Sequence, residues 1–446
     1  MASTNLTRTQ VAGNRKKFTI SAWVKRSKLS YNFSMWFCSG VYQTDQMAQI
    51  YWATDDRLRF GGWDSNGNTN HYLTTNRLFR DVNAWYHIVC GVDTTQNTAS
   101  DRIKLYVNGV QETSFFNDGV TQYPAQNYDY SFNDSGNPMA IGTRPSYTGG
   151  YHEGYISHLH FCDGYQYQAS DFGSTDSTTG EWTINTNPSF TLGTNGFTIL
   201  KDGNTYTDQS SNSNNWTLAG STGVITKIED CPDNVFATWN PLSPNDSITY
   251  SNGNLTVTGS NATNYSMSCS TTLGASSGKY YWEMKYVTAG NGNECIGVAN
   301  FDRYEYNQNM TSGTTGYVSL RWDGERQINN VSTTYFTPPS TGAILMCAMD
   351  MDNGKVFFGS NGVWFGSGNP VTGANPTADI LTSGTWGGIL RYLSSKWECN
   401  FGNGYFGTTE ITTNTGTGFQ DADGNGRFFY NPPTNFRCLS TKGLNQ

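Results

Sequence analysis

Two neighbouring stretches of the chain decide its fold class. Residues 85–93 read WYHIVCGVD, and residues 101–110 read DRIKLYVNGV. Between residues 103 and 107 apolar side chains alternate with polar or aromatic ones, which is the period of a half-buried strand. The Asn108-Gly109 pair that follows is a strong signal for a tight hairpin turn. Together the two stretches predict antiparallel strands packed on an apolar core.

A third stretch, residues 17–26 (KFTISAWVKR), alternates over ten residues. It places Phe18, Ile20, Ala22 and Val24 on one face of a strand. Such runs recur at short spacing, and no amphipathic helix of ten residues or more is apparent. A chain of 446 residues is too long for one sandwich and about right for two. The sequence therefore predicts an all-β protein of two tandem antiparallel β-sandwiches.

The composition favours the same fold class. Charged residues make up 14% of the chain against roughly 25% in ordinary domains, and Asn, Thr, Ser and Gly supply the polar surface instead. These residues favour turns and strands over helices. The nine cysteines are spread evenly without a CxxC spacing. We therefore expect them to be small buried hydrophobic residues that stay reduced.

Three parts of the chain differ in pattern. Residues 1–228 form the expected first domain, and its polar, glycine-rich segment 175–228 carries aromatic residues at intervals. Disordered segments are poor in aromatic residues, so this segment is expected to wrap the domain. A new series of strands predicts a second sandwich over 229–408. The aromatic residues of the tail, 409–446, predict that it packs back on the second domain.

Several classes of partner are excluded by charge and hydropathy. The net charge of −8 argues against nucleic acid, because phosphate binding needs a basic face. No stretch approaches the ~18 apolar residues of a membrane span. The N-terminus shows no basic-then-apolar secretory leader. The protein is therefore expected to be made in a cytoplasm.

The first domain resembles the laminin-G-like, concanavalin A-like jelly roll. The resemblance rests on an early Trp strand at 18–25, a strand with Trp and His at 85–88, a hairpin at 104–109 and a late strand at 155–164. These four elements occur in the order that the family shows. Members of this family bind glycans and proteins, so the resemblance implies a binding scaffold.

The second domain resembles the SPRY sandwich. Five motifs stand in the family's order, at residues 278–283, 296–299, 349–358, 361–364 and 400–402. SPRY domains mostly bind peptides and protein surfaces. The resemblance therefore implies a second binding scaffold behind the first.

The tandem pair also resembles large structural proteins of marine bacteriophages. The segments that carry this resemblance are 13–19, 172–180, 428–433 and 438–442. It implies a virion surface component, such as a tail fibre, head appendage or capsid decoration, assembled in the host cytoplasm. The missing secretory leader fits, because virions leave the cell by lysis.

An enzyme is the alternative that the jelly-roll superfamily raises, since it includes glucanases. Their pattern Glu-x-Asp-x-x-Glu does not occur here. Retaining glycosidases need two carboxylates about 5–5.5 Å apart, whereas Glu283 and Glu398 are isolated on strands. Adjacent Asp55 and Asp56 point apart in a turn. We expect no catalytic activity.

Aromatic residues in loops are the best candidates for ligand binding, because sugars stack on aromatic faces beside amide or carboxylate groups. The candidates of the first domain are Trp63, Asp64, Asn66, Tyr72, Tyr147, Tyr151 and His152. Those of the second domain are Tyr304, Tyr306, Trp322 and Asp323.

One segment resembles the opening of an EF-hand loop. Asp421, Asp423 and Asn425 fall at its first three ligand positions, but Pro432 stands where the bidentate Glu belongs. Two interpretations stay open, a tight Asx-rich turn and a calcium-ordered turn with these three residues as ligands. No other cofactor is expected.

The leading hypothesis is a virion surface protein that binds, in the manner of a lectin, a host surface glycan or protein or a neighbouring virion protein. The alternative is a purely structural cement or spacer without a ligand. A homo-oligomer is expected, with a trimer as the first guess, although the sequence has no heptad stalk.

Overall fold

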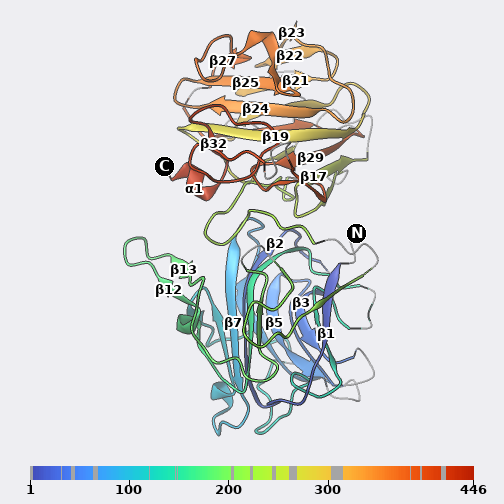
Figure 1. The fold of residues 1–446 in the computed structure, drawn as a ribbon, viewed down its shortest axis with the longest axis vertical. Helices are drawn as coiled ribbons and strands as arrows, with labels where there is room; N and C mark the ends of the chain where they lie inside the picture. Colours follow the sequence, from blue (N-terminus) through green and yellow to red (C-terminus); the bar gives the residue numbers. More distant parts are fainter. Residues whose placement is uncertain are drawn as a thin grey trace. The chain divides into compact units, whose positions relative to one another are not determined.

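The chain divides into two compact units, Met1–Lys227 and Ile228–Gln446. The computed structural model describes residues 4–31, 33–41, 46–63, 69–119, 121–145, 147, 149–201, 205–220, 225–243, 248–260, 269–302, 315–381, 383–391, 394–412 and 418–445. Each unit consists of facing sheets, and nearly all strand pairs are antiparallel (Figure 1). The expected all-β class with two tandem β-sandwiches is confirmed.

Two large sheets and a small hairpin make up the first unit. The seven-stranded sheet has the order β15 (Thr217–Ala219), β1 (Asn5–Thr9), β10 (Pro138–Ile141), β3 (Ser34–Ser39), β4 (Met47–Trp52), β5 (Arg57–Trp63) and β6 (Thr69–Leu78). The six-stranded sheet has the order β14 (Phe197–Ile199), β11 (Gly154–Asp163), β2 (Lys17–Arg26), β7 (Trp85–Asp93), β8 (Ile103–Val107) and β9 (Val110–Gln111). The hairpin pairs β12 (Gly173–Thr175) with β13 (Trp182–Ile184), and two 3-10 turns lie at Ala99–Asp101 and Ala169–Asp171.

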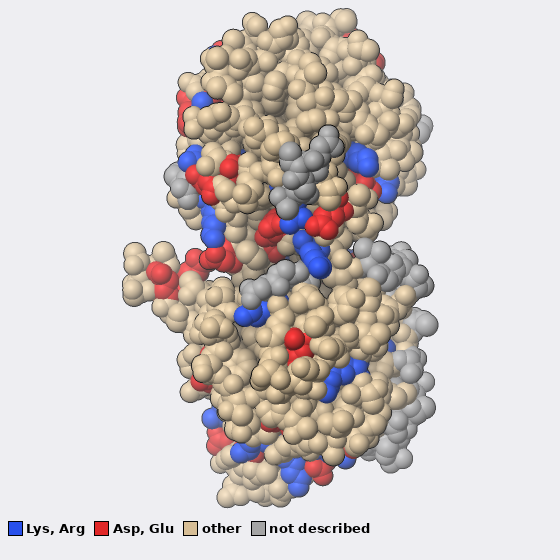
Figure 2. Space-filling model, in the orientation of Figure 1, with Lys and Arg blue, Asp and Glu red and all other residues tan. Residues whose placement is uncertain are grey.

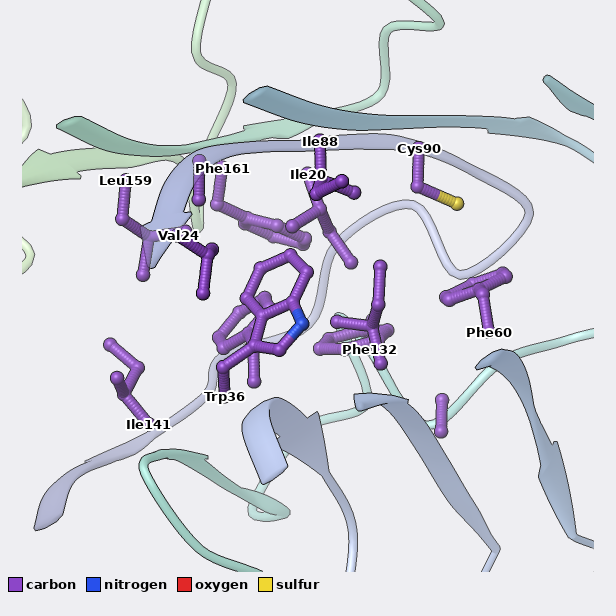
Figure 3. Packing of buried hydrophobic residues seen from close by; sticks show 14 of the residues in the cluster. Ile20, Val24, Trp36, Phe60, Ile88, Cys90, Phe132, Ile141, Leu159 and Phe161 are labelled. Carbon is purple, nitrogen blue, oxygen red and sulfur yellow. The ribbon is translucent and has the colours of Figure 1, made fainter. Parts of the chain in front are cut away.

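The core of this unit lies between its two sheets. Phe18, Ile20, Ala22 and Val24 of β2 are all fully buried there, which confirms the face predicted from their alternation. Trp36 from β3 reaches into the core from the opposite sheet (Figure 3). Burying each large apolar side chain contributes about 1.5–3 kcal/mol, so this interior holds the two sheets together.

The polar segment that ends the first unit adds strands to both sheets. Its strand β14 pairs with β11, and β15 pairs with β1. The hairpin is attached through Trp182, whose indole N–H donates to Nδ1 of His87 at 3.0 Å. The His87 ring lies nearly parallel to the rings of Trp182 and Trp23, with ring centres 5.9 and 4.9 Å away.

The second unit is likewise a sandwich. Its larger sheet follows the order β16 (Ile248–Ser251), β17 (Thr256–Gly259), β29 (Lys396–Asn400), β19 (Lys279–Thr288), β24 (Ile344–Asp350), β25 (Lys355–Ser360) and β26 (Val363–Trp364), with β27 (Ala378–Asp379) on β25 and β32 (Arg437–Cys438) on β19. The six-stranded sheet follows the order β18 (Cys269–Ser270), β28 (Trp386–Arg391), β20 (Cys295–Asn300), β21 (Tyr317–Arg321), β22 (Glu325–Ile328) and β23 (Val331–Thr334). A small pair, β30 (Tyr405–Phe406) and β31 (Thr409–Glu410), a 3-10 turn (Phe365–Ser367) and helix α1 (Thr441–Leu444) complete it.

The C-terminal tail packs on this second sandwich. Strand β32 lies parallel to the start of β19. Phe428 and Phe436 of the tail are fully buried in a cluster with Tyr281 of β19. The tail therefore covers one face of the larger sheet.

All nine cysteines are free thiols, and eight of them are buried. Cys231 and Cys438, which flank the second unit, form no disulfide. Burial raises the pKa of the Cys38 thiol to about 12, so it stays protonated. The thiols pack as small hydrophobic side chains.

Charged side chains are sparse on the surface. On the face drawn in Figure 2, uncharged residues cover most of the protein. This agrees with the charged fraction of 14%. Among the described residues, no helix is long and apolar enough to pass through a bilayer.

Candidate ligand-binding site

The outer face of the seven-stranded sheet carries a layer of polar and aromatic side chains. Ile50 and Trp52 of β4 enter the core, so their neighbours Gln49 and Tyr51 point away from it. Tyr51 packs on this outer side in a cluster with Met35, Ala53 and Tyr72, against which Phe33 and Trp63 also lie. Such a layer on the solvent side of a sandwich is unusual, because this side normally carries isolated polar residues.

A buried guanidinium stands at the centre of this layer. Arg144 is only 3% exposed, and its Nε donates to Oε1 of Gln49 at 3.2 Å. The guanidinium carbon lies 4.7 Å from the ring centre of Phe33, 5.1 Å from Trp63 and 5.5 Å from Tyr147. Each distance is within cation–π range. We call Phe33, Trp63, Arg144 and Tyr147 the Arg144 cluster.

This cluster brings together two segments that the sequence predicted separately as candidates for ligand binding. Trp63 ends β5, and Tyr147 lies some eighty residues further along the chain. Both side chains are half-buried. Phe33, Gln49 and Arg144 were not predicted. The available signal for Arg144 was a lone cation three residues before Tyr147 in a charge-poor chain.

Tyr72 is buried, which corrects the expectation of an exposed loop residue. It lies on β6, is 4% exposed, and accepts a hydrogen bond from Nε2 of Gln49 at 2.6 Å. Burial raises the pKa of its hydroxyl well above the ordinary value. Because Gln49 also binds Arg144, Tyr72 supports the Arg144 cluster from below and offers no open ring.

A carboxylate on the same face is fully engaged. Oδ2 of Asp118 lies 2.9 Å from Nη2 of Arg59 and accepts from Oγ1 of Thr74 at 3.1 Å. Its Oδ1 accepts from Oγ1 of Thr121 at 2.8 Å. Both carboxylate oxygens of Asp118 are therefore bound by groups of the protein itself.

Two of the remaining first-domain candidates, Tyr151 and His152, lie within the described residues. Tyr151 is half-buried and forms an isolated parallel bridge with Met35. Nδ1 of His152 hydrogen-bonds Oγ of Ser34 at 3.2 Å, and burial lowers the pKa of His152 to about 4. Asp64 and Asn66 fall outside the described residues.

The two candidates of the second unit that the structure describes, Trp322 and Asp323, do not form a site. Trp322 is 8% exposed and packs in the core, with ring centres 4.8 Å from Tyr286 and 5.0 Å from Trp397. The expectation that it serves as a surface aromatic is wrong, because its ring turns inward from the end of β21. Asp323 is exposed and accepts from Nε of Arg321 at 2.6 Å. Tyr304 and Tyr306 lie outside the described residues.

The loop with the EF-hand resemblance is closed by its own hydrogen bonds. Oδ1 of Asp421 accepts the backbone N–H groups of Asp423 and Asn425, and Oδ2 accepts that of Cys438. Asp423 forms an ion pair of 2.5 Å with Arg437. Two ligand positions are thus occupied by N–H groups or a cation, which favours the Asx-rich turn over a calcium site. The described residues hold no group of three or more His, Cys, Asp or Glu side chains suited to a metal ion.

The Arg144 cluster has the chemistry of a saccharide site. Partly exposed Trp63 and Tyr147 rings offer faces for sugar C–H surfaces. The guanidinium between them is buried and both amide atoms of Gln49 are engaged, so the rings are the groups that a ligand would contact. The arrangement supports binding and supplies no paired carboxylates for hydrolysis among the described residues.

Comparison with known proteins agrees with the two sandwiches. Residues 2–165 match the family model of the concanavalin A-like lectin/glucanases superfamily, and residues 279–370 match that of the SPRY domain. Among solved structures, the SPRY domain of human HERC1 is 18% identical, with 36% of this chain and 96% of that chain covered and a TM-score of 0.29. The TRIM65 PSpry domain is 15% identical, with 37% and 91% covered and a TM-score of 0.28.

A heptameric SAP-like pentraxin from Limulus polyphemus is also similar, at 17% identity, with 37% of this chain and 72% of that chain covered and a TM-score of 0.25. These structural similarities are too low to bear on function. The family matches fall on the two units in the order expected from the sequence. The chain therefore carries a laminin-G-type, concanavalin A-like domain followed by a SPRY domain.

Proposed function

We propose that the protein is a non-catalytic bacteriophage virion surface protein whose concanavalin A-like domain binds a host surface saccharide at the Arg144 cluster. The observation that carries the binding part is the convergence of Trp63 and Tyr147 on one buried guanidinium. The virion part rests on the resemblance of segments 13–19, 172–180, 428–433 and 438–442 to bacteriophage structural proteins. A fibre, an appendage and a decoration protein are all compatible with it.

Rigidity of the cluster supports the binding role. Arg144 is held by Gln49, which is itself bonded to Tyr72, so the rings of Trp63 and Tyr147 pack on a fixed support. A preorganised site loses little conformational entropy when a ligand binds. The SPRY domain is proposed to contact a neighbouring virion protein, in keeping with a family of protein-binding scaffolds.

The binding part is tested with the intact chain on a glycan array and in pull-downs with host cells. Trp63→Ala and Tyr147→Ala are each expected to lower saccharide binding roughly 2- to 10-fold, since stacking on an aromatic ring contributes on the order of 0.5–1.5 kcal/mol. Tyr165→Ala is the matched control, because Tyr165 is an exposed aromatic residue on another part of the same domain. Equal binding by all three variants would exclude the Arg144 cluster as the site.

The virion part has a separate test. Mass spectrometry of purified particles is expected to find the chain, and immunogold labelling is expected to place it on their surface. A chain that binds saccharide but is absent from particles would refute only the virion role. Presence on particles without any bound saccharide or cell would instead favour a cement or spacer subunit.

A further inference from the structure

Strand β23 (Val331–Thr334) forms an open end of the six-stranded sheet in the second unit. It pairs with β22 on one side and ends the sheet order on the other (Figure 1). All four of its residues are exposed, and Val331 is 64% exposed. Strands at a sheet edge offer unpaired backbone groups to other chains.

The register fixes which backbone groups point outward. Asn329 and Asn330 both have positive φ, at 45° and 73°, as in a two-residue type I′ hairpin turn. The pair Ile328–Val331, which flanks this turn, is then hydrogen-bonded. Along the two strands, hydrogen-bonded pairs then alternate with pairs that are not hydrogen-bonded. The N–H of Tyr335 donates to the carbonyl of Gly324 at 2.9 Å, in phase with this alternation.

Val331, Thr333 and Tyr335 therefore direct their backbone groups toward β22. Ser332 and Thr334 direct theirs out of the sheet. No described segment forms a backbone hydrogen bond with these outward groups. The edge offers two N–H and two C=O groups at the spacing of a β-ladder.

This edge lacks the features that usually prevent pairing between chains. Natural edge strands are kept apart by charges, proline, bulges or very short length. The sequence Val-Ser-Thr-Thr has no charge and no proline, and its register with β22 is regular. The edge strands β9 and β26, by comparison, are only two residues long.

We propose that β23 pairs antiparallel with β23 of a second copy of the chain, about a two-fold axis that passes through Thr333. In this register Ser332 lies opposite Thr334 of the second copy, and the outward groups of the two strands form four backbone hydrogen bonds. The same register sets exposed Val331 opposite Tyr335 of the second copy. Aliphatic–aromatic pairs across strands are favourable, so the contact also covers apolar surface.

The contact is isologous and gives a dimer, unlike the trimer that was the first guess from the sequence. One short strand pair buries less than the ~1,200 Å² of a standard stable interface. The dimer is therefore weak and depends on concentration. The β23–β23 contact becomes strong when an assembly already holds many copies of the chain close together, because pairing then takes place within the assembly at a high effective concentration.

The test uses sedimentation velocity of the full chain over a range from about 10 μM to about 500 μM, which spans weak protein association. The wild-type chain is expected to shift toward a dimer with rising concentration. Thr333→Lys or Thr333→Glu alone sets like charges directly opposite each other on the axis and abolishes the shift. An equimolar mixture of the two variants restores it, because the charges across the axis are then opposite.

Val363→Lys on β26 is the matched control, since Val363 is also an exposed edge residue, at 69%. This variant is expected to associate like the wild type. Hydrogen exchange gives a second measurement: the Ser332 and Thr334 amides exchange quickly in dilute solution and become protected in the dimer. Circular dichroism confirms that each variant is folded.

Two outcomes would overturn the proposal. A chain that stays monomeric at every concentration, with fast exchange at Ser332 and Thr334, shows that β23 does not pair with itself. A dimer that neither Thr333 variant weakens, or that the mixture does not restore, places the contact on another surface.

Discussion

The backbone N–H of Tyr430 donates a hydrogen bond of 2.7 Å to the carboxylate of Glu283 in the middle of β19. The neighbouring N–H of Phe429 donates to the same carboxylate at 2.8 Å. Tyr281 and Asn400 add side-chain donors from the sheet, at 3.0 and 3.2 Å. Glu283 is fully buried, so this one carboxylate attaches the C-terminal tail to the second sandwich.

Replacing this carboxylate is expected to loosen the tail. In Glu283→Gln, an NH₂ group takes the place of one accepting oxygen and faces a donor N–H. The free energy of unfolding at pH 8 should fall by about 1–3 kcal/mol, the cost of a buried unsatisfied donor. Urea unfolding measures the change, and limited proteolysis should cut the tail first.

Glu325→Gln serves as the control for this variant. The Glu325 side chain is 31% exposed and pairs with Arg321 on the surface, so its loss should cost less than about 1 kcal/mol. Equal losses in the two variants would show that the Glu283 contacts do not hold the tail.

The buried histidines are expected to make the protein sensitive to acid. Burial lowers the pKa of His71 and His87 to about 3 and that of His152 to about 4, and it also lowers the pKa of His160 well below its ordinary value. Below the ordinary pKa of about 6.5 the unfolded chain therefore binds more protons than the folded chain. The free energy of unfolding should fall as the pH drops from about 6.5 toward 4, by up to about 1.4 kcal/mol per pH unit for each histidine.

Glu283 acts in the opposite direction. Burial raises its pKa to about 7, despite the donors that lower it, so the folded chain retains this proton between about pH 4.5 and 7. Burial also raises the pKa of Glu153, which acts in the same direction as Glu283. Each carboxyl offsets at most one histidine, so the four histidines leave a net loss of stability in acid. Unfolding by urea between pH 7.5 and 4.5 measures it. His71→Gln should flatten the pH dependence, and an unchanged slope would contradict the lowered pKa of His71.

The thiols are expected to differ sharply in reactivity. Cys231 is the one cysteine that is not fully buried, and the other eight lie in the sheets or the core. An aromatic disulfide reagent should titrate about one thiol in the folded chain and all nine in urea, because buried protonated thiols are inert. Cys231→Ser should remove the fast-reacting thiol. Several fast thiols in the native chain would contradict the burial.

Calcium should not stabilise the loop at Asp421. Added calcium and added EDTA are each expected to leave the melting temperature unchanged, because both carboxylate oxygens already accept backbone N–H groups. Asp421→Asn should lower the free energy of unfolding by about 1–2 kcal/mol both with calcium and with EDTA, because one accepting oxygen is lost. A rise in melting temperature with calcium that this variant abolishes would restore the calcium-ordered turn.

Local sequence determined the elements and the fold class of this protein. The alternation in β2 put Phe18 and Ile20 on the core face, and Asn108-Gly109 marked the turn between β8 and β9, because strand period and turn chemistry depend on near neighbours. The same local patterns were enough to recognise two different sandwiches in order.

Only the tertiary structure decided which of the predicted ligand-binding side chains lie close together. Trp63 and Tyr147 converge because β5, which ends at Trp63, and β10, which precedes the loop with Tyr147, belong to the same sheet. These two strands are far apart in the sequence. Tyr72 and Trp322 looked like surface aromatics, yet both rings are buried. Whether an aromatic ring turns into a core or toward solvent depends on the packing of distant strands, and that packing is set by burial over the whole domain.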